Sequence, residues 1–286
     1  MSSSKIRAKS SDYELGSLLR HWRSVRSTSQ LDLSLDTGVS QRHISFIESG
    51  RSVPSRKTLL DIAQALDIPL RERNTLLQAA GYAPMYSESP LTALEMQGVT
   101  KALERMLRQH EPFPAVVMDR HWNVLMANAS TPRFFSHFID MAARKGPRNL
   151  LHLMFDPHGM RPFLADWENI AQSLIQRVHR ESIARVIDDG TKELLAALLA
   201  YPGTKREWKS PEVQSIVPHT PVIPLRFIEG DNVLSYFSMV TTVGTPQTVA
   251  AQELRVECLF PADDATEARH LMMMKADGSQ SVNETR

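Results

Sequence analysis

The sequence contains a single cysteine, Cys258, among its 286 residues. One thiol cannot form an internal disulfide, which excludes a secreted fold that depends on disulfides. Cys258 lies in a strand-like run, so we expect it to be buried and inert rather than nucleophilic. No apolar run approaches the length of about 18 residues that a membrane-spanning helix needs. The polar N-terminus lacks the apolar region of a signal peptide, and these absences together predict a cytoplasmic protein without membrane contact.

The motifs of common enzyme classes are also missing. The sequence has no phosphate-cradling GxxxxGK loop, no GxSxG nucleophile elbow and no HExxH metal motif. His152 and His158 are six residues apart, which is not a helical metal pair, and His137 and His179 stand alone. We therefore predict no enzymatic activity, no cofactor and no metal site.

Charge of either sign is nearly balanced, with a net charge of +1. Residues 1–84 carry 12 Lys and Arg against 8 Asp and Glu, whereas the remainder carries 21 against 24. A small basic part joined to a larger, mildly acidic part suits a module that meets phosphates beside one that does not. A charge of +4 over 84 residues is also unremarkable, so charge alone does not decide the function.

The stretch SQLDLSLDTGVSQRHISFIESGR, which starts at Ser29, is the most informative part of the sequence. It predicts two short helices, over 30–37 and 41–49, joined by a tight turn at Gly38. Ser29 and Ser40 stand at the helix starts, where a serine hydroxyl satisfies an unpaired backbone N–H. Glycine adopts the left-handed conformation that such a turn requires.

This pattern is typical of a helix-turn-helix, in which the second helix offers side chains to base edges in the major groove. The residues expected to face inward are Leu31, Leu33, Leu35, Val39, Ile44 and Ile47. The residues left facing outward on the second helix are Gln41, Arg42, His43 and Ser45. The stretch therefore predicts DNA binding.

Three more helices flank this pair, because apolar residues recur at helical spacing over 13–27, 56–66 and 70–80. Five short helices make an all-α bundle. The pattern then changes to one helix, two short strands, further helices and three strands, which predicts an α+β domain with one mostly antiparallel sheet. The expected elements of this second part are helices at 94–109, 130–141 and 161–201 and strands at 115–118, 122–127, 223–228, 234–243 and 253–260.

Composition also predicts the boundaries between these parts. We expect a disordered tail over 1–11, a helix-turn-helix domain over 12–82 and a linker over 83–93. The second domain follows over 94–268, and a flexible tail completes the chain over 269–286.

Two stretches of the sequence resemble known families. Residues 14–80 resemble the XRE (Cro/C1-type) helix-turn-helix family through GVSQRHISFIESGR, PSRKTLLDIAQALDIPL and Gln30. Most of residues 95–267 resembles the ligand-binding domain of MmyB-like transcription regulators through VVMDRHWNVLMAN, NLLHLMFDPHGMRPFLADWENIA and FSMVTTVGTPQTVAAQELRVECLFPADDAT. The resemblance implies an α + (α+β) chain, with a five-helix bundle followed by a PAS-like antiparallel sheet with packed helices. It also implies an interior cavity for a fatty-acid-like ligand.

The first resemblance assigns roles in DNA binding to individual residues. Gln41 suits adenine and Arg42 suits guanine, each bidentate contact discriminating by roughly 1–3 kcal/mol. Gln30 is expected to meet a phosphate at a helix N-terminus, and Phe46 either contacts a thymine methyl or packs at a protein surface. The full predicted set for DNA is Gln30, Ser40, Gln41, Arg42, His43, Ser45, Phe46, Arg51 and Lys57.

The same family pattern places Arg23 opposite Glu48, and we predict an ion pair that ties the first helix to the recognition helix. One copy of this domain contacts a single half-site of an operator. Dimers gain affinity by placing two recognition helices about 34 Å apart. We therefore predict a homodimer on an inverted repeat of double-stranded DNA.

The second domain is rich in large apolar residues, which fill cores more often than they bind ligands. Loosely packed helices on the sheet would nevertheless leave an apolar pocket. We expect Arg161, His158 or Arg226 to receive a carboxylate and Asn128 to satisfy backbone groups. The residues predicted to contact a ligand are Phe134, Phe155, Arg161, Phe163, Leu164, Trp167, Phe227, Phe237 and Met239.

Two functions follow from these patterns. The first is a one-component transcription regulator that binds an operator as a homodimer and senses a small apolar ligand. The alternative is a ligand-independent regulator or adaptor whose second domain only mediates dimerisation or protein interaction. Comparing DNA affinity with and without an acyl ligand separates the two, because a ligand shifts DNA affinity only through unequal binding to two states.

Overall fold

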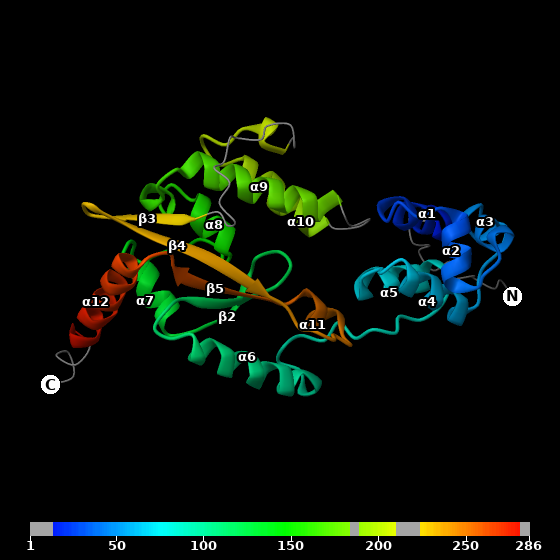
Figure 1. Ribbon diagram of the computed structural model, residues 1–286, viewed down its shortest axis with the longest axis horizontal. Helices are drawn as coiled ribbons and strands as arrows, with labels where there is room; N and C mark the ends of the chain where they lie inside the picture. The colour runs from blue at the N-terminus through cyan, green and yellow to red at the C-terminus, as the bar shows by residue number, and fades with distance from the viewer. Residues whose placement is uncertain (1–13, 184–188, 210–223, 281–286) are drawn as a thin grey trace, which may run out of the picture. The chain divides into compact units, whose positions relative to one another are not determined.

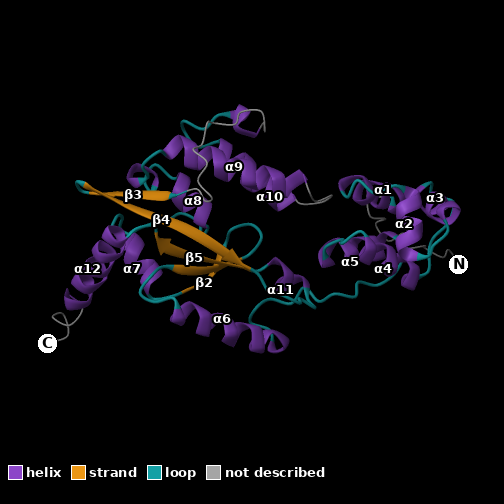
Figure 2. Cartoon of the chain, in the orientation of Figure 1, coloured by secondary structure: helices purple, strands orange, loops and turns teal. Residues whose placement is uncertain are grey.

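The computed structural model describes residues 14–183, 189–209 and 224–280 (Figure 1). The chain divides into two compact units. The first contains residues 14–89 and 246–252, and the second contains the remaining described residues. Figure 2 shows that the first unit is helical, whereas the strands all belong to the second.

All five helices predicted for the first unit are present, with boundaries within two residues of the prediction. They are α1 (Leu15–Val25), α2 (Gln30–Thr37), α3 (Gln41–Glu48), α4 (Arg56–Ala65) and α5 (Leu70–Ala79). Their shared core is built around Trp22, Leu33 and Ile47, each 2% exposed or less.

Serine side chains define where α2, α3 and α4 begin. The Ser29 hydroxyl accepts a hydrogen bond from Asp32 N, and the Asp32 carboxylate accepts one from Ser29 N, which completes a capping box. At the starts of α3 and α4, the Ser40 and Ser55 hydroxyls accept hydrogen bonds from His43 N and Thr58 N. Gly38 ends α2 with a φ of 69°, the left-handed conformation predicted for the turn.

The predicted inward face of α2 is wrong at two positions. Leu33 is buried, but Leu31 and Leu35 are 53% and 75% exposed. Successive helical residues are 100° apart, so residues two apart point to different sides of a helix. Leu33 therefore cannot share a face with Leu31 and Leu35, and it is Leu33 that faces the core.

Gly16 allows α1 and α3 to approach closely. A Cβ at this position would lie 2.4 Å from the carbonyl oxygen of Glu48 and 2.9 Å from that of Ile47. Both obstacles are backbone atoms, which cannot move aside as a flexible side chain does. Glycine at this position therefore lets the backbone of α1 lie directly against the end of the predicted recognition helix.

The first unit also includes a piece of chain from far along the sequence. The Gln252 side chain accepts a hydrogen bond of 2.7 Å from Leu70 N, at the first turn of α5. Pro69, the N-cap residue, offers no side-chain cap of its own. Val249 N donates to Ser87 O at 2.9 Å, and the Val249 side chain is fully buried. Val249 and Gln252 belong to α11 (Val249–Glu253), a helix that the sequence did not predict.

The second unit contains a five-stranded antiparallel sheet in the order β2-β1-β5-β4-β3. Its strands are β1 (Ala115–Met118), β2 (Val124–Ala127), β3 (Leu225–Glu229), β4 (Asn232–Thr241) and β5 (Arg255–Pro261). Its α-helices are α6 (Gln97–Gln109), α7 (Ser130–Ser136), α8 (Leu150–Phe155), α9 (Trp167–Ile183), α10 (Asp189–Leu199) and α12 (Asp264–Gln280). Short 3-10 turns lie at Leu94–Met96, Arg161–Phe163 and Arg206–Lys209. The result is the predicted α+β, PAS-like architecture.

The two faces of the sheet are covered by different helices (Figure 1). Tyr236 and Leu259 point toward the core that includes α8, α9 and α10. The neighbouring Phe237 and Phe260 stack on each other, and Phe260 also meets His110 after α6 at 4.7 Å. Cys258 is buried as predicted, and burial together with the charge of Glu257 raises the pKa of its thiol.

Several helices differ from the prediction. The expected helix over 161–201 is divided into a 3-10 turn, α9 and α10, and residues 184–188, which follow α9, lie outside the described part. The expected helix over 130–141 ends at Ser136, and α8 was not predicted. Within the described residues, no helix is long and apolar enough to cross a bilayer.

The expectation of a loose tail is wrong for 269–280, which continue α12. Met273 and Met274 are 3% and 7% exposed, because they pack into the core of the second unit. His270 is fully buried, and each of its ring nitrogens has a hydrogen-bond partner. Its Nε2 lies 2.9 Å from Pro112 O, and its Nδ1 lies 2.8 Å from the Tyr236 hydroxyl.

These contacts predict that the protein loses stability in mild acid. Burial lowers the pKa of His270, although its hydrogen bond to Pro112 O acts in the opposite direction. In the unfolded state, His270 takes up a proton near pH 6.5. The stability that depends on neutral, buried His270 is therefore fully present above that pH and is lost as pH falls through the folded-state pKa. Unfolding free energy measured by urea titration between pH 7.5 and 5 should fall more steeply for the wild type than for His270→Gln. An equally steep fall in the variant would contradict the assignment of this pH dependence to His270. His152, whose pKa burial also lowers, accounts for the slope that remains in the variant.

Candidate DNA-reading helix and ligand pocket

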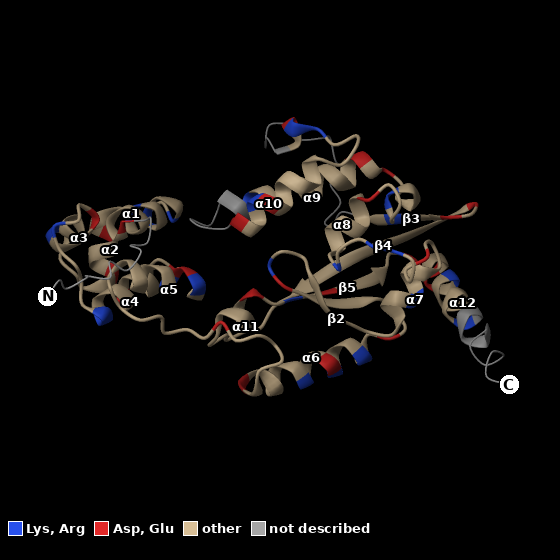
Figure 3. Cartoon of the chain, turned by 180° about the vertical axis from the view of Figure 1, so that it is seen from behind, with Lys and Arg blue, Asp and Glu red and all other residues tan. Residues whose placement is uncertain are grey.

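The N-terminal end of α3 presents the side chains predicted to read DNA. Gln41 and Arg42 are exposed in the first turn of the helix, directly after the Ser40 cap. His43 and Ser45 are half-buried, and His43 Nε2 lies 3.4 Å from the Ser52 hydroxyl. Figure 3 shows the basic and acidic residues along the helices of this unit. An exposed amide and an exposed guanidinium at a helix start have the chemistry to meet base edges.

Phe46 lies between two arginines. The guanidinium carbon of Arg42 is 5.3 Å from the centre of its ring, and that of Arg51 is 5.7 Å away. Both distances are within the range of a cation–π contact. The half-buried ring therefore restricts the Arg42 side chain on the exposed side of α3, a relation that the sequence did not predict.

Glu48 connects α1, α2 and α3 at the base of this surface. Arg23 contacts it through both Nε–Oε1 at 2.7 Å and Nη2–Oε2 at 3.0 Å, so the predicted ion pair is present. The Gln30 amide donates to Oε2 at 2.8 Å, and Arg20 Nη2 donates to the Glu48 carbonyl oxygen at 2.8 Å. The Glu48 side chain is only 3% exposed. This network fixes the orientation of α3 relative to the other two helices.

Electrostatics keep the Glu48 carboxylate ionised. Burial acts to raise its pKa, but hydrogen bonds from Arg23 and Gln30 and the positive charges of Arg23 and Arg20 outweigh burial and lower the pKa. A buried carboxylate with several donors is stable only while all of them remain in place. The Gln30 side chain is part of this network, so its predicted phosphate contact would have to come from the backbone N–H in the first turn of α2.

The two remaining basic residues predicted to meet phosphates are exposed. Arg51 follows the C-terminal turn of α3. Lys57 lies in the first turn of α4 and pairs with Asp61 at 2.7 Å, with its side chain 86% exposed. An exposed pair of this kind contributes little to stability, so Lys57 is free to exchange its partner for a phosphate.

The second unit contains a pocket of about 330 Å³ between the sheet, α7 and the loop that leads to α8. We call it the loop pocket. Its apolar lining comes from Val116, Val124, Ala127, Pro132, Phe135, Met141, Pro147, Leu150 and Leu153. Its volume lies at the lower end of the range for small-molecule sites.

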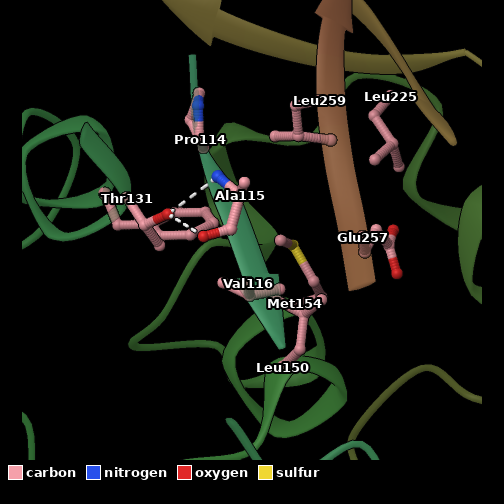
Figure 4. Close-up of a pocket in the computed structure, with 10 residues that line it drawn as sticks. Pro114, Ala115, Val116, Thr131, Leu150, Met154, Leu225, Glu257 and Leu259 are labelled. Atoms are coloured by element: carbon pink, nitrogen blue, oxygen red, sulfur yellow. Dashed lines mark hydrogen bonds between the residues drawn. The ribbon is translucent and has the colours of Figure 1, made fainter. Parts of the chain in front are cut away.

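A narrower space of about 30 Å³ adjoins the loop pocket, and we call it the inner pocket (Figure 4). Both pockets are lined by Val116, Thr131, Phe135 and Leu150. The lining of the inner pocket further includes Pro114, Ala115, Met154, Leu225, Glu257 and Leu259. An elongated apolar group entering the loop pocket would therefore point toward the sheet.

Few polar groups line the pockets, and two of them have their hydrogen bonds made. The Thr131 hydroxyl bonds both Ala115 N and Ala115 O (Figure 4). The Asn149 side chain caps α8 and donates to the His121 carbonyl oxygen at 2.7 Å. Glu257 is 7% exposed, and burial raises its pKa although the charges of Arg177 and Arg255 oppose that effect.

None of the nine residues predicted to contact a ligand lines the loop pocket or the inner pocket. Phe134, Phe155 and Phe227 are fully buried in the core. Phe237 and Met239 lie on the opposite face of the sheet, where Met239 is 53% exposed. Phe163, Leu164 and Trp167 pack around these. The ring centroids of Phe163 and Phe138 are 5.5 Å apart, and those of Trp167 and Phe155 are 4.9 Å apart. Leu164 forms an isolated β-bridge with Phe227. Contact between these nine residues and a ligand stays a prediction.

The basic residues expected to receive a carboxylate have other partners. Arg161 stacks on Trp167 at 4.7 Å and donates to the carbonyl oxygen of Pro202. Arg226 pairs with Asp166, and His158 is exposed after α8. The basic residues that do line the loop pocket are Arg144 and Arg148, which the sequence did not single out.

Asn128 satisfies backbone groups, as the sequence predicted. Its Oδ1 accepts hydrogen bonds of 3.1 Å from both Ala115 N and Thr131 N. Its Nδ2 donates to Phe113 O at 2.7 Å and to Leu107 O at 3.3 Å. One side chain thereby connects the end of α6, the start of β1 and the start of α7.

Comparison with known proteins bears on both units. A solved structure described as "Structure of an RNA-binding Light-Oxygen-Voltage Receptor" aligns over 98% of this chain and 69% of that chain. The sequence identity is 12% and the TM-score is 0.26, so this likeness indicates neither a shared fold nor a shared function. No curated protein matches the chain.

Two family models match. The helix-turn-helix model matches residues 26–73, which include α2 and α3. The model of the MmyB-like transcription regulator ligand binding domain matches residues 99–272, more than half of the chain, and this range contains both pockets and the whole sheet. The chain therefore belongs to the MmyB-like transcription regulators, with a helix-turn-helix ahead of the ligand-binding domain.

Proposed function

We propose that this DNA-binding transcription regulator binds an inverted-repeat operator as a homodimer and that a fatty-acid-like ligand changes its affinity for that operator. The DNA-binding part is supported by the exposed first turn of α3, a helix that Glu48 links to α1 and α2 through hydrogen bonds. The apolar loop pocket of about 330 Å³ supports the ligand-binding part. The two matched families are transcription regulator domains rather than enzymes.

In this proposal, Gln41 and Arg42 read base edges, and His43, Ser45 and Phe46 line the same face of α3. The backbone at the start of α2, together with Arg51 and Lys57, contacts phosphates. Such contacts position the protein on the duplex without selecting sequence. Two copies are needed because one α3 spans a single half-site, and half-sites of an inverted repeat lie one helical turn apart.

The ligand acts through linkage. A molecule in the second unit changes operator affinity only if it binds two arrangements of the dimer unequally. The coupling constants of such systems typically correspond to 5- to 150-fold changes in affinity. A ligand that stabilises one arrangement would therefore change the occupancy of an operator.

Selection of duplexes from a random-sequence library by the full-length protein tests the DNA-binding part. We expect the recovered sites to be inverted repeats with half-sites about 10–10.5 base pairs apart. Gln41→Ala and Arg42→Ala should each weaken binding to the selected site by roughly 5- to 150-fold, the equivalent of about 1–3 kcal/mol, and should relax the preference at one base position.

Lys57→Ala is the matched control, because loss of a phosphate contact weakens binding to all sequences alike. Arg42→Ala with wild-type affinity and wild-type sequence preference would refute the proposed reading helix. Single, unrepeated sites would refute the homodimer.

A further inference from the structure

Building on the proposed ligand sensing, we propose that Gln252 and Glu253 are positioning residues that couple the second unit to operator binding. These two neighbouring residues of α11 are tied to different units of the chain. A change in either unit is therefore passed to the other through a single peptide bond. Neither family model assigns this role to a residue.

Gln252 completes the first turn of α5. The backbone N–H groups in the first turn of a helix have no partner within that helix and need an acceptor from elsewhere. Pro69 precedes α5 and offers no side-chain acceptor. The Gln252 side chain supplies it, since its oxygen accepts a hydrogen bond of 2.7 Å from Leu70 N. A helix of the DNA-binding unit is thus capped by a residue 182 positions further along the chain.

The start of α11 is also held in the first unit. Val249 N donates to Ser87 O at 2.9 Å, and the Val249 side chain is fully buried. The segment that carries Ser87 is itself fixed to α5. The buried Asn74 side chain donates to Tyr86 O at 2.7 Å and accepts from Met85 N and Tyr86 N at 3.0 Å. α11 is therefore bound to α5 both directly and through this segment.

Glu253, the next residue, is tied to the second unit. Its Oε1 lies 3.3 Å from Nη1 of Arg120 in the turn between β1 and β2, and each of the two side chains is only 12% exposed. A partly buried pair of this kind is screened less than an exposed one. The boundary between the two units consequently falls between Gln252 and Glu253.

β5 connects this boundary to the pockets of the second unit. One residue separates Glu253 from the start of β5 at Arg255. Further along the same strand, Glu257 and Leu259 line the inner pocket. A displacement of β5 by an occupant of the pocket would therefore reach Glu253 along the strand and α5 through Gln252. Because coupling by linkage is reciprocal, DNA on the first unit acts on β5 by the same route.

Hydrogen exchange of the full-length protein with and without a selected operator duplex tests this coupling in the absence of any ligand. In the wild type, the duplex should slow exchange in 38–52, which includes α3, and should also alter exchange in 232–261, which includes β4 and β5.

Gln252→Met removes the acceptor of Leu70 N and keeps a side chain of similar size. It should abolish the effect of the duplex on 232–261. Exchange in 66–80 should become faster by about 2- to 10-fold, the equivalent of one lost hydrogen bond. Protection of 38–52 by the duplex should persist, which reports that the DNA-binding unit of the variant is folded.

Glu253→Ala breaks the pair with Arg120. It should also abolish the effect on 232–261, but it should leave exchange in 66–80 unchanged because Gln252 still caps α5. Gln252→Glu retains an oxygen acceptor and should behave as the wild type. Gln247→Met is the matched control, since Gln247 is an exposed glutamine of the same segment, and it should also respond to the duplex as the wild type does.

Two results would overturn the coupling. One is a duplex that protects 38–52 in the wild type without altering 232–261. The other is an alteration of 232–261 that persists in either Gln252→Met or Glu253→Ala. An equal loss in Gln247→Met would also contradict a specific role for Gln252.

Operator titrations with decanoate, a saturated fatty-acid anion, separate this coupling from the proposed ligand sensing. If decanoate changes the operator Kd equally in the wild type and in Gln252→Met, ligand sensing stands and coupling through Gln252 fails. If decanoate leaves the operator Kd unchanged while the duplex alters 232–261 only when Gln252 and Glu253 are intact, the coupling stands and the proposed ligand sensing fails.

Discussion

Glu48→Ala is expected to destabilise the first unit by about 3–5 kcal/mol. The substitution removes the acceptor of Arg23 and Gln30 and leaves their donors partly buried without a partner. It also frees α3 from α1 and α2, so operator binding should be lost together with stability. Hydrogen exchange followed by mass spectrometry in peptides from 14–80 measures this local opening in the full-length protein.

Two variants calibrate this result. Glu48→Gln retains an oxygen acceptor and should cost less than Glu48→Ala. Asp61→Ala breaks the exposed pair with Lys57 and should change the opening free energy by less than about 1 kcal/mol. If Glu48→Ala were as mild as Asp61→Ala, the Glu48 network would not hold the three helices together.

Asn128→Ala is expected to destabilise the second unit by about 3 kcal/mol. The substitution leaves Phe113 O without its 2.7 Å donor, whereas Thr131 N loses its side-chain acceptor but keeps the backbone Asn128 O at 3.3 Å. Each buried polar group left unsatisfied costs about 1–3 kcal/mol. Ala115 N is spared because the Thr131 hydroxyl also accepts from it. Urea unfolding of the full-length protein measures the effect.

Asn128→Asp distinguishes the two ends of this amide. It keeps the acceptor but replaces the Nδ2 donors with an oxygen that faces Phe113 O, so it should be at least as damaging as Asn128→Ala. Asn169→Ala, an exposed asparagine of α9, should stay within about 0.5 kcal/mol of the wild type. An Asn128→Asp variant as stable as the wild type would show that the donor half of the amide is dispensable.

Local chemistry explains why the first unit could be predicted so closely. The capping serines, Ser29 and Ser40, and the left-handed Gly38 act within four residues of their own positions, so their signals can be read directly. The error at Leu31 and Leu35 was geometric, since residues at a spacing of two cannot share one helix face.

Long-range packing explains what the sequence did not reveal. α12 extends past 269 because Met273 and Met274 pack against a core assembled from distant segments. The predicted aromatic residues instead fill the core, which is the more frequent role of large apolar side chains.

The most direct test of the account is fluorescence anisotropy of a labelled, selected operator duplex titrated with the full-length protein, with and without saturating decanoate. We predict that decanoate changes the Kd for the operator by about 5-fold or more, within the usual range of allosteric coupling. Superimposable titrations of the wild type with and without decanoate would contradict the account and favour a ligand-independent regulator.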